Sequence, residues 1–334
     1  MCGKNRYVSK SLTVGGLSPL ELPRPLEETA ESEIERKRVV GRVTTQVLKF
    51  LCNEFTDNGF EWLLPVIFSQ STDPLWPDAN ASVEKRLEVE IYGKTVRPTA
   101  SMIVHKLVAC SLAHPKLFSL SPNIRIEKRE RALTGVHAYE FTQLDFEVRD
   151  ADSDHIRHFV EEVLHLLVTD LRSSMEDELF YLRTDHSLPR LVVPFKVYER
   201  KELEKEHGAE WESEALLRST EPFWVTDFPR EFYDFEDFET SRWDNYDLFV
   251  PVYGEVLSGA RREHEYSKII SKMERDSVRK ENYSVLLRLA QERRLRPSAG
   301  AGIGLERLVS WLVQARHIGE VQLFPRIPGV IHEL

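Results

Sequence analysis

The chain has 334 residues, of which 41% are hydrophobic and 30% charged, and its formal net charge at pH 7 is −10. This composition is ordinary for a globular protein that buries a sizeable core, and the negative balance argues against broad electrostatic binding to nucleic acid. No apolar run approaches the length of a membrane span, and three cysteines without metal-like spacing favour a reduced, cytoplasmic protein.

The N-terminal part of the sequence predicts a leader, a helix and a strand. Residues 1–30 are rich in Gly, Pro and polar residues and predict a flexible leader, followed by one domain over residues 31–334. From Glu31, apolar residues recur at helical spacing, and Asn58 with Gly59 supplies a stop. The apolar segment that follows contains Pro65, which lacks a donor and therefore favours a sheet edge or an interface.

A loop and a second helix are predicted next. The segment from Gln70 to Glu90 has the composition of a loop, and Thr99 to Ala113 is predicted as a capped helix with Ser101 and Lys106 near its start. Taken alone, Lys106 is read as a solvated helix lysine. Its neighbours decide whether it has another role.

An antiparallel hairpin is predicted at Ser121 to Val148, where two alternating segments flank a charged loop that contains glycine. Its strands could carry a guanidinium, carboxylates, an imidazole and an aromatic ring on one face, which suits a nucleotide together with an amino acid. Ordinary cross-strand ion pairs are the alternative. The side chains concerned are Arg125 and Glu127 on the first strand and His137, Phe141 and Asp145 on the second.

The C-terminal half predicts helices separated by strands. Helical spacing is present over 154–176 and 208–218, and the charged run 263–294 predicts a solvated helical face. Tyr246 to Glu263 is predicted as strand, turn and strand, and Gly300 to Leu312 as a strand of small residues that runs into a helix. These two segments carry Asp247, Glu255, Ser258, Arg262 and Arg307.

The ordered pattern R-x-E, H-x-x-E-F-x-x-L-D-x-E, G-E-x-x-S-G-x-x-R-E and G-x-G-x-E-R resembles motifs 2 and 3, and the acidic strand between them, of class II aminoacyl-tRNA synthetases of the aspartyl and asparaginyl subgroup. The resemblance implies an α+β fold with a mostly antiparallel sheet flanked by helices. It also implies a homodimer formed through the first helix and the Pro65 segment.

The resemblance implies an adenylate-forming site that uses ATP and Mg²⁺. Arg125 would bridge the α-phosphate and the attacked carboxylate with its bidentate fork. Glu127 would accept a hydrogen bond from the adenine amino group, and Phe141 would stack on the ring with Arg307 on the other face. His137 and Arg307 would meet the γ-phosphate. The implied metal ligands are Asp247 and Glu255, with Ser258 beside them.

For the amino acid, the resemblance implies that Asp145 holds the ammonium group and that Lys106 and Arg262 meet a carboxylate. Ser101 and, five residues later, Lys106 match the aspartyl enzymes, and the retained lysine points to aspartate. A further acidic contact to the ammonium group would come from the 70–90 loop, where the candidates are Asp73 and Asp78.

Two departures bear on the reaction. Val136 stands where the family usually has arginine before the motif 2 histidine, and Arg129 or Arg131 are the candidates to compensate. The tRNA enzymes also carry an N-terminal OB-fold barrel, for which residues 1–30 are too few.

A core that has Lys106 without such a barrel resembles the archaeal-type asparagine synthetase. This relative implies AMP-forming amidation of L-aspartate by ammonia through an aspartyl-adenylate, with tRNA not expected as a partner. Two alternatives stay open: the adenylate passes to another amine or to tRNA, or the chain is a non-catalytic amino-acid-binding paralogue.

Overall fold

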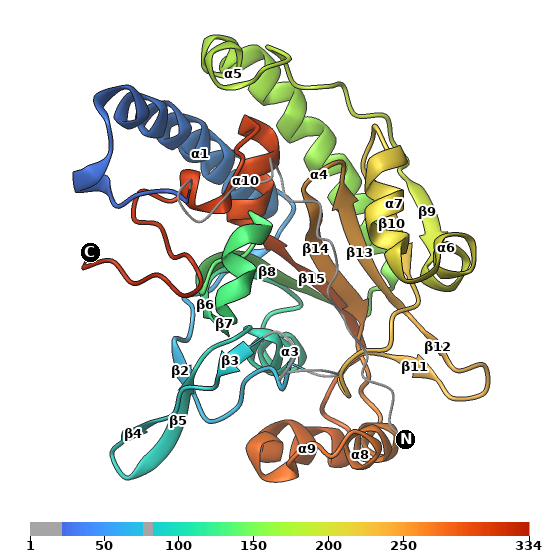
Figure 1. Ribbon diagram of the computed structural model, residues 1–334. Helices are drawn as coiled ribbons and strands as arrows, with labels where there is room; N and C mark the ends of the chain where they lie inside the picture. The colour runs from blue at the N-terminus through green and yellow to red at the C-terminus, as the bar shows by residue number, and fades with distance from the viewer. Residues whose placement is uncertain (1–21, 76–82, 334) are drawn as a thin grey trace, which may run out of the picture.

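The computed structural model describes residues 22–75 and 83–333 (Figure 1). Most of the predicted leader and the candidate Asp78 lie outside the described residues. The boundary at residue 30 therefore stays a prediction. Among the described helices, none is both long and apolar enough to cross a membrane.

Eight strands form the central sheet: β1 (Glu61–Trp62), β6 (Lys116–Ile124), β8 (Glu140–Arg149), β9 (Lys196–Glu199), β10 (Phe223–Thr226), β13 (Asn245–Val250), β14 (Gly254–Arg261) and β15 (Ser298–Gly304). Their order is β1-β6-β8-β15-β14-β13-β10-β9. Only the pairs at the two edges, β1 with β6 and β9 with β10, are parallel. The mostly antiparallel sheet and the α+β class are thus confirmed.

Smaller sheets and helices surround this centre. Strands β2 (Phe68–Ser69), β5 (Lys94–Pro98) and β4 (Val89–Ile91) form one small sheet, β3 (Val83–Lys85) pairs with β7 (Ile126–Glu127), and β11 (Glu236–Asp237) pairs with β12 (Arg242–Trp243). The helices are α1 (Glu31–Asp57), α3 (Ile103–Leu112), α4 (Ser153–Ser174), α5 (Glu176–Leu182), α6 (Arg200–His207), α7 (Trp211–Arg218), α8 (Tyr266–Arg275), α9 (Ser284–Gln291) and α10 (Leu305–Val313).

The two faces of the sheet differ in what covers them (Figure 1). Helices α1, α4 and α10 lie on one face and enclose the main core, to which β8 contributes Leu144, Phe146 and Val148. Successive side chains of a strand point to opposite faces, so Phe141, Asp145 and the other odd-numbered positions of β8 face the side of α3. The candidate site lies on this second face.

The hairpin prediction is confirmed for β6 and β8, with a longer first strand, but Glu127 lies on β7, which pairs with β3, and His137 precedes β8. Strand β6 pairs antiparallel with β8 from Lys116 onward, and Asn123 lies opposite Phe141. The tip contains a 3-10 helix over Arg129–Thr134. Residues of the first strand and of the loop therefore reach the same end of the site.

Two helix predictions are corrected by packing. The helix predicted from Thr99 begins at Ile103, because the Thr99 hydroxyl donates to the carbonyl oxygens of Val66 and Ile67 and ties this segment to the residues that precede β2. The run 263–294 is two helices, not one solvated face. Their buried side chains, including Ile269 and Leu286, form a second core cluster with α3 and the 232–233 segment.

Candidate active site

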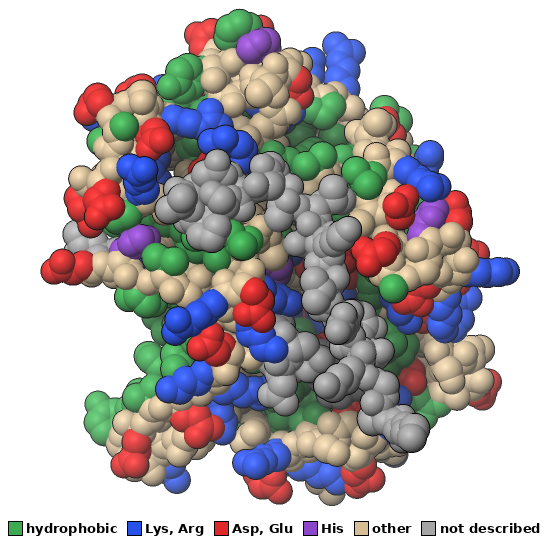
Figure 2. Space-filling view, in the orientation of Figure 1, with side chains coloured by type: hydrophobic (Ala, Val, Ile, Leu, Met, Phe, Trp, Pro, Cys, Tyr) green, Lys and Arg blue, Asp and Glu red, His purple; other side chains and the backbone are tan. Residues whose placement is uncertain are grey.

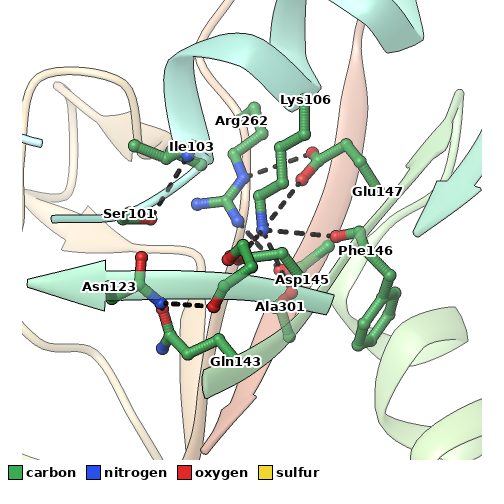
Figure 3. A network of polar contacts seen from close by, with 12 residues as sticks. Ser101, Ile103, Lys106, Asn123, Gln143, Asp145, Phe146, Glu147, Arg262 and Ala301 are labelled. Atoms are coloured by element: carbon green, nitrogen blue, oxygen red, sulfur yellow. Dashed lines mark hydrogen bonds and ion pairs between the residues drawn. The ribbon is translucent and has the colours of Figure 1, made fainter. Parts of the chain in front are cut away.

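A buried polar network marks the end of the site under α3 (Figure 3). The ammonium group of Lys106 lies 3.2 Å from Asp145 Oδ1, 3.0 Å from the carbonyl oxygen of Ala301 and 3.7 Å from Glu147 Oε2. Asp145 also accepts a hydrogen bond from the Ser121 hydroxyl at 2.7 Å. Lys106 is only 3% exposed, so it is not the solvated helix lysine of the alternative reading. Lys106 and Asp145, which were predicted to meet different groups of the amino acid, form an ion pair with each other.

Arg262 completes this network from the end of β14, and all three of its nitrogens are engaged. Nε donates to Glu147 Oε1 at 3.2 Å, Nη1 to Asp234 Oδ1 at 2.5 Å, and Nη2 to the carbonyl oxygen of Gly300 at 3.0 Å. The close approach requires glycine at position 300, since a Cβ there would lie 2.2 Å from the carbonyl oxygen of Phe146. Ser101 lies at the rim, where its hydroxyl accepts from the Ile103 amide.

Arg125 and Phe141 lie beside each other at the other end of the same face. The guanidinium carbon of Arg125 is 5.3 Å from the Phe141 ring centroid, and its Nε and Nη2 donate to the carbonyl oxygen of Ala100 at 3.1 and 3.0 Å. Arg307, predicted for the other face of the adenine, is held by two backbone carbonyl groups. It donates to the carbonyl oxygens of Val136 and Glu255 at 3.0 and 2.8 Å.

The arginines surround His137 and Glu127. Burial and the charges of Arg307, Arg131 and Arg125 lower the pKa of His137 well below its usual range, so the imidazole is neutral at physiological pH. Burial raises the pKa of Glu127, whose carboxylate accepts from Arg131 Nη1 at 3.1 Å. A cluster with this positive charge suits a polyphosphate.

The Val136 departure has a local explanation in these contacts. The Val136 side chain packs against the main core, and only its carbonyl oxygen contributes, as the acceptor for Arg307. Arg131 already faces the cluster through Glu127, whereas the Arg129 side chain is 76% exposed. Of the two candidates for compensation, Arg131 is therefore the better placed.

The predicted metal ligands lie on β13 and β14, next to an arginine that the sequence analysis had not selected. Arg230 donates to Asp247 Oδ2 and, at 3.0 Å, to the Ser258 hydroxyl. Asp247 Oδ1 is buried without a partner in the described residues. An unpartnered carboxylate oxygen close to the charge of Glu255 fits a divalent cation, which is commonly bound through one or two carboxylates. The described residues contain no cluster of three or more potential ligands.

Asp247 gives a testable pH dependence. Burial raises its pKa from 3.8 to about 7, so the folded state holds this proton more tightly than the unfolded state. Its contribution to the free energy of unfolding is therefore present at low pH and lost as the pH rises toward 7. Compared with Asp247→Asn, the wild type should lose on the order of 1–3 kcal/mol between pH 5 and pH 8. Urea unfolding of both proteins at each pH measures this loss. A wild-type stability that rises with pH relative to Asp247→Asn would contradict the prediction.

The segment between β10 and β11 supplies two residues that sequence reasoning missed, Arg230 and Asp234. No role was predicted for this segment. The alternation of charged and aromatic residues in PREFYDFED was the available signal. Asp73, one of the two loop candidates, is buried and lines a small pocket together with Arg125.

Comparison with known proteins agrees with this geometry. The family described as tRNA synthetases class II (D, K and N) matches residues 39–328. An asparagine–tRNA ligase of Thermococcus kodakarensis is 30% identical over 65% of this chain and 54% of its own length. An aspartate–tRNA(Asp/Asn) ligase of Methanopyrus kandleri is 31% identical over 69% of this chain and 55% of its own length. The chain spans about half the length of these curated relatives.

A solved structure shows the same fold. The asparaginyl-tRNA synthetase of Pyrococcus horikoshii, complexed with asparaginyl-adenylate, superposes with a TM-score of 0.78 and 22% identity, over 95% of this chain and 77% of that one. With most of the sequence matched by one family, the chain belongs to the class II tRNA synthetases of the D, K and N group.

Proposed function

We propose that the protein activates L-aspartate with ATP to an aspartyl-adenylate and transfers the aspartyl group to ammonia, forming L-asparagine and AMP. The observation that carries the activation step is the arrangement on one face of β8. Asp145, with buried Lys106, marks one end, and Phe141, with Arg125, marks the other. Four residues of strand span about 13 Å, a separation that suits an amino acid joined to a nucleotide.

The chain's own groups account for binding and orientation. An aspartate carboxylate oxygen attacks the α-phosphorus, and pyrophosphate leaves with the electrons of the broken P–O bond. Arg125 neutralises the charge that develops between the two reactants, and Arg307 and neutral His137 hold the phosphates in line. When bound at Asp247 and Glu255, Mg²⁺ would neutralise phosphate charge.

In the second step, the amine nitrogen attacks the activated carbonyl carbon, AMP leaves with the C–O bond electrons, and the nitrogen loses a proton. The relatives are tRNA ligases, which favours a tRNA acceptor at least as strongly as ammonia. Figure 2 shows basic and acidic side chains mixed over the face in view, in keeping with the net charge of −10. The acceptor therefore has to be measured.

The deciding experiment measures pyrophosphate release from ATP, Mg²⁺ and aspartate, with and without ammonium, and separates the amino-acid products by chromatography. A third reaction contains tRNA and radiolabelled aspartate. Asparagine formed only with ammonium supports the proposal, and label on tRNA assigns the acceptor to tRNA instead. Pyrophosphate release without either product points to another amine, and no release in any of these reactions refutes the activation step.

We also propose that the chain forms a homodimer through α1 and the segment around Pro65. This segment exposes large apolar side chains, with Trp62 at 52%, Leu64 at 89% and Ile67 at 50% exposure. Such a patch favours a protein interface.

Leu64→Glu should convert the dimer into a monomer in sedimentation equilibrium, because burying the carboxylate there is costly. Tyr92→Glu, at a fully exposed turn, is the matched control and should remain dimeric.

A further inference from the structure

Arg262 is neutralised from within the protein in the very network that is proposed to bind a substrate carboxylate. Two cations, Lys106 and Arg262, contact three buried carboxylates, Asp145, Glu147 and Asp234. The adjacent pair of Lys272 and Glu263 adds no net charge. With the substrate ammonium group at Asp145, the side chain of aspartate would be a third carboxylate, beside Glu147 and Asp234, for two cations. Like charges this close in a buried site oppose binding.

One of the two carboxylates on Arg262 therefore has to make way for an acidic substrate, and the contacts distinguish them. Glu147 is held on both sides: its Oε1 also accepts from the Ser298 hydroxyl at 2.8 Å, and its Oε2 lies 3.7 Å from Lys106 Nζ. The Asp234 carboxylate has, among the described residues, a single hydrogen-bond donor, Arg262 Nη1. Asp234 is thus the group that can leave.

The backbone of Asp234 remains fixed when its side chain moves. Residue 234 forms a β-bridge with Arg262, and its carbonyl oxygen accepts from Lys272 Nζ at 2.5 Å. The neighbouring amides are also bonded, since Phe235 N donates to the carbonyl oxygen of Arg261 and Glu263 N to that of Tyr233. A rotation of the side chain alone frees Arg262, without unfolding the segment.

We propose that Asp234 determines the selectivity of this pocket between acidic and neutral amino acids. It occupies Arg262 in the empty site, yields Arg262 to a substrate carboxylate, and stays in place when the substrate side chain is neutral. This inference rests on the proposed function, because it assumes that Lys106 and Arg262 form the amino-acid end. Asp234 acts through Arg262 and is a positioning residue.

The test is Asp234→Asn, which removes the competing charge and keeps an oxygen that can accept from Arg262. Equilibrium binding of aspartate and asparagine is measured by calorimetry, together with pyrophosphate release for each. Asp234→Asn should bind aspartate at least tenfold more tightly than the wild type, with less than a threefold change for asparagine. Asp234→Ser repeats the charge change if the first variant unfolds. Glu236→Gln is the matched control, because Glu236 is a buried carboxylate on the same segment and pairs with Arg275. Its loss should leave the ratio of the aspartate affinity to the asparagine affinity unchanged.

The outcomes separate the inference from the proposed function. A shifted aspartate-to-asparagine ratio without pyrophosphate release upholds the role of Asp234 and refutes adenylation. Pyrophosphate release with an unchanged ratio in folded variants upholds adenylation and overturns the role of Asp234. An equal shift in Glu236→Gln, or no aspartate binding by any variant, also overturns it.

Discussion

Replacing Arg125 by alanine should lower aspartate-dependent pyrophosphate release by roughly a hundred- to a thousandfold, the usual cost of removing one preorganised donor at a developing charge. Arg125 is oriented before any substrate binds, because two of its nitrogens donate to the carbonyl oxygen of Ala100 and its guanidinium lies over Phe141. Arg125→Lys should recover only part of the rate, since lysine lacks the bidentate fork.

The Arg125 variants should remain folded. Arg125 is half-buried and bonds to a backbone carbonyl, and its removal leaves no carboxylate without a partner. Thermal unfolding close to that of the wild type, with activity lost, would localise the defect to the reaction. Arg288→Ala, on an exposed position of α9, serves as the control and should keep full activity. Rapid pyrophosphate release by Arg125→Ala would refute the placement of the α-phosphate.

Replacing Arg262 by methionine should destabilise the protein by about 3–5 kcal/mol, the range found when one partner of a buried ion pair is removed. Methionine fills much of the space of the arginine stem but leaves Glu147 and Asp234 without their shared cation. Both carboxylates are nearly inaccessible to water, so solvent cannot replace the lost charge. Urea unfolding at pH 7 measures the loss.

A double variant tests whether this cost arises from the charges. Asp234→Asn removes one of the two carboxylates that Arg262→Met leaves without a cation. The double variant should therefore lose less free energy of unfolding than the two single variants lose together. Arg294→Met, from an exposed pair with Glu292, should change stability by less than about 0.5 kcal/mol. Strict additivity in the double variant would mean that Arg262 contributes through packing alone.

The strand period made part of the site predictable from the sequence. Positions two apart along a strand share a face, so Phe141 and Asp145 were expected on one side of β8, and the structure places them there. The apolar spacing and the Asn58 stop likewise predicted α1, which ends at Asp57. That Lys106 and Asp145, 39 positions apart, belong to the same end of the site was expected only from the resemblance of their motifs to a known family.

Other features depended on contacts that local pattern does not encode. The charged run 263–294 predicted a solvated face, yet Lys272 is completely buried there, because Glu263 and the carbonyl oxygen of Asp234 satisfy it. Periodicity reports which residues share a face, but it does not report what packs against that face.

The sequence by itself determined the family and the mostly antiparallel sheet, and it predicted the residues at the two ends of the candidate site, because strand and helix periods and ordered motifs are local properties of the chain. Only the tertiary structure decided that Arg230 meets Asp247 and that Asp234 meets Arg262. These pairs join residues 17 and 28 positions apart through the folding of the 227–235 segment against β13 and β14. Each buried carboxylate needs a cation, because burial makes an unpaired charge costly. Packing decides which cation that is, whatever the separation of the two residues in the sequence.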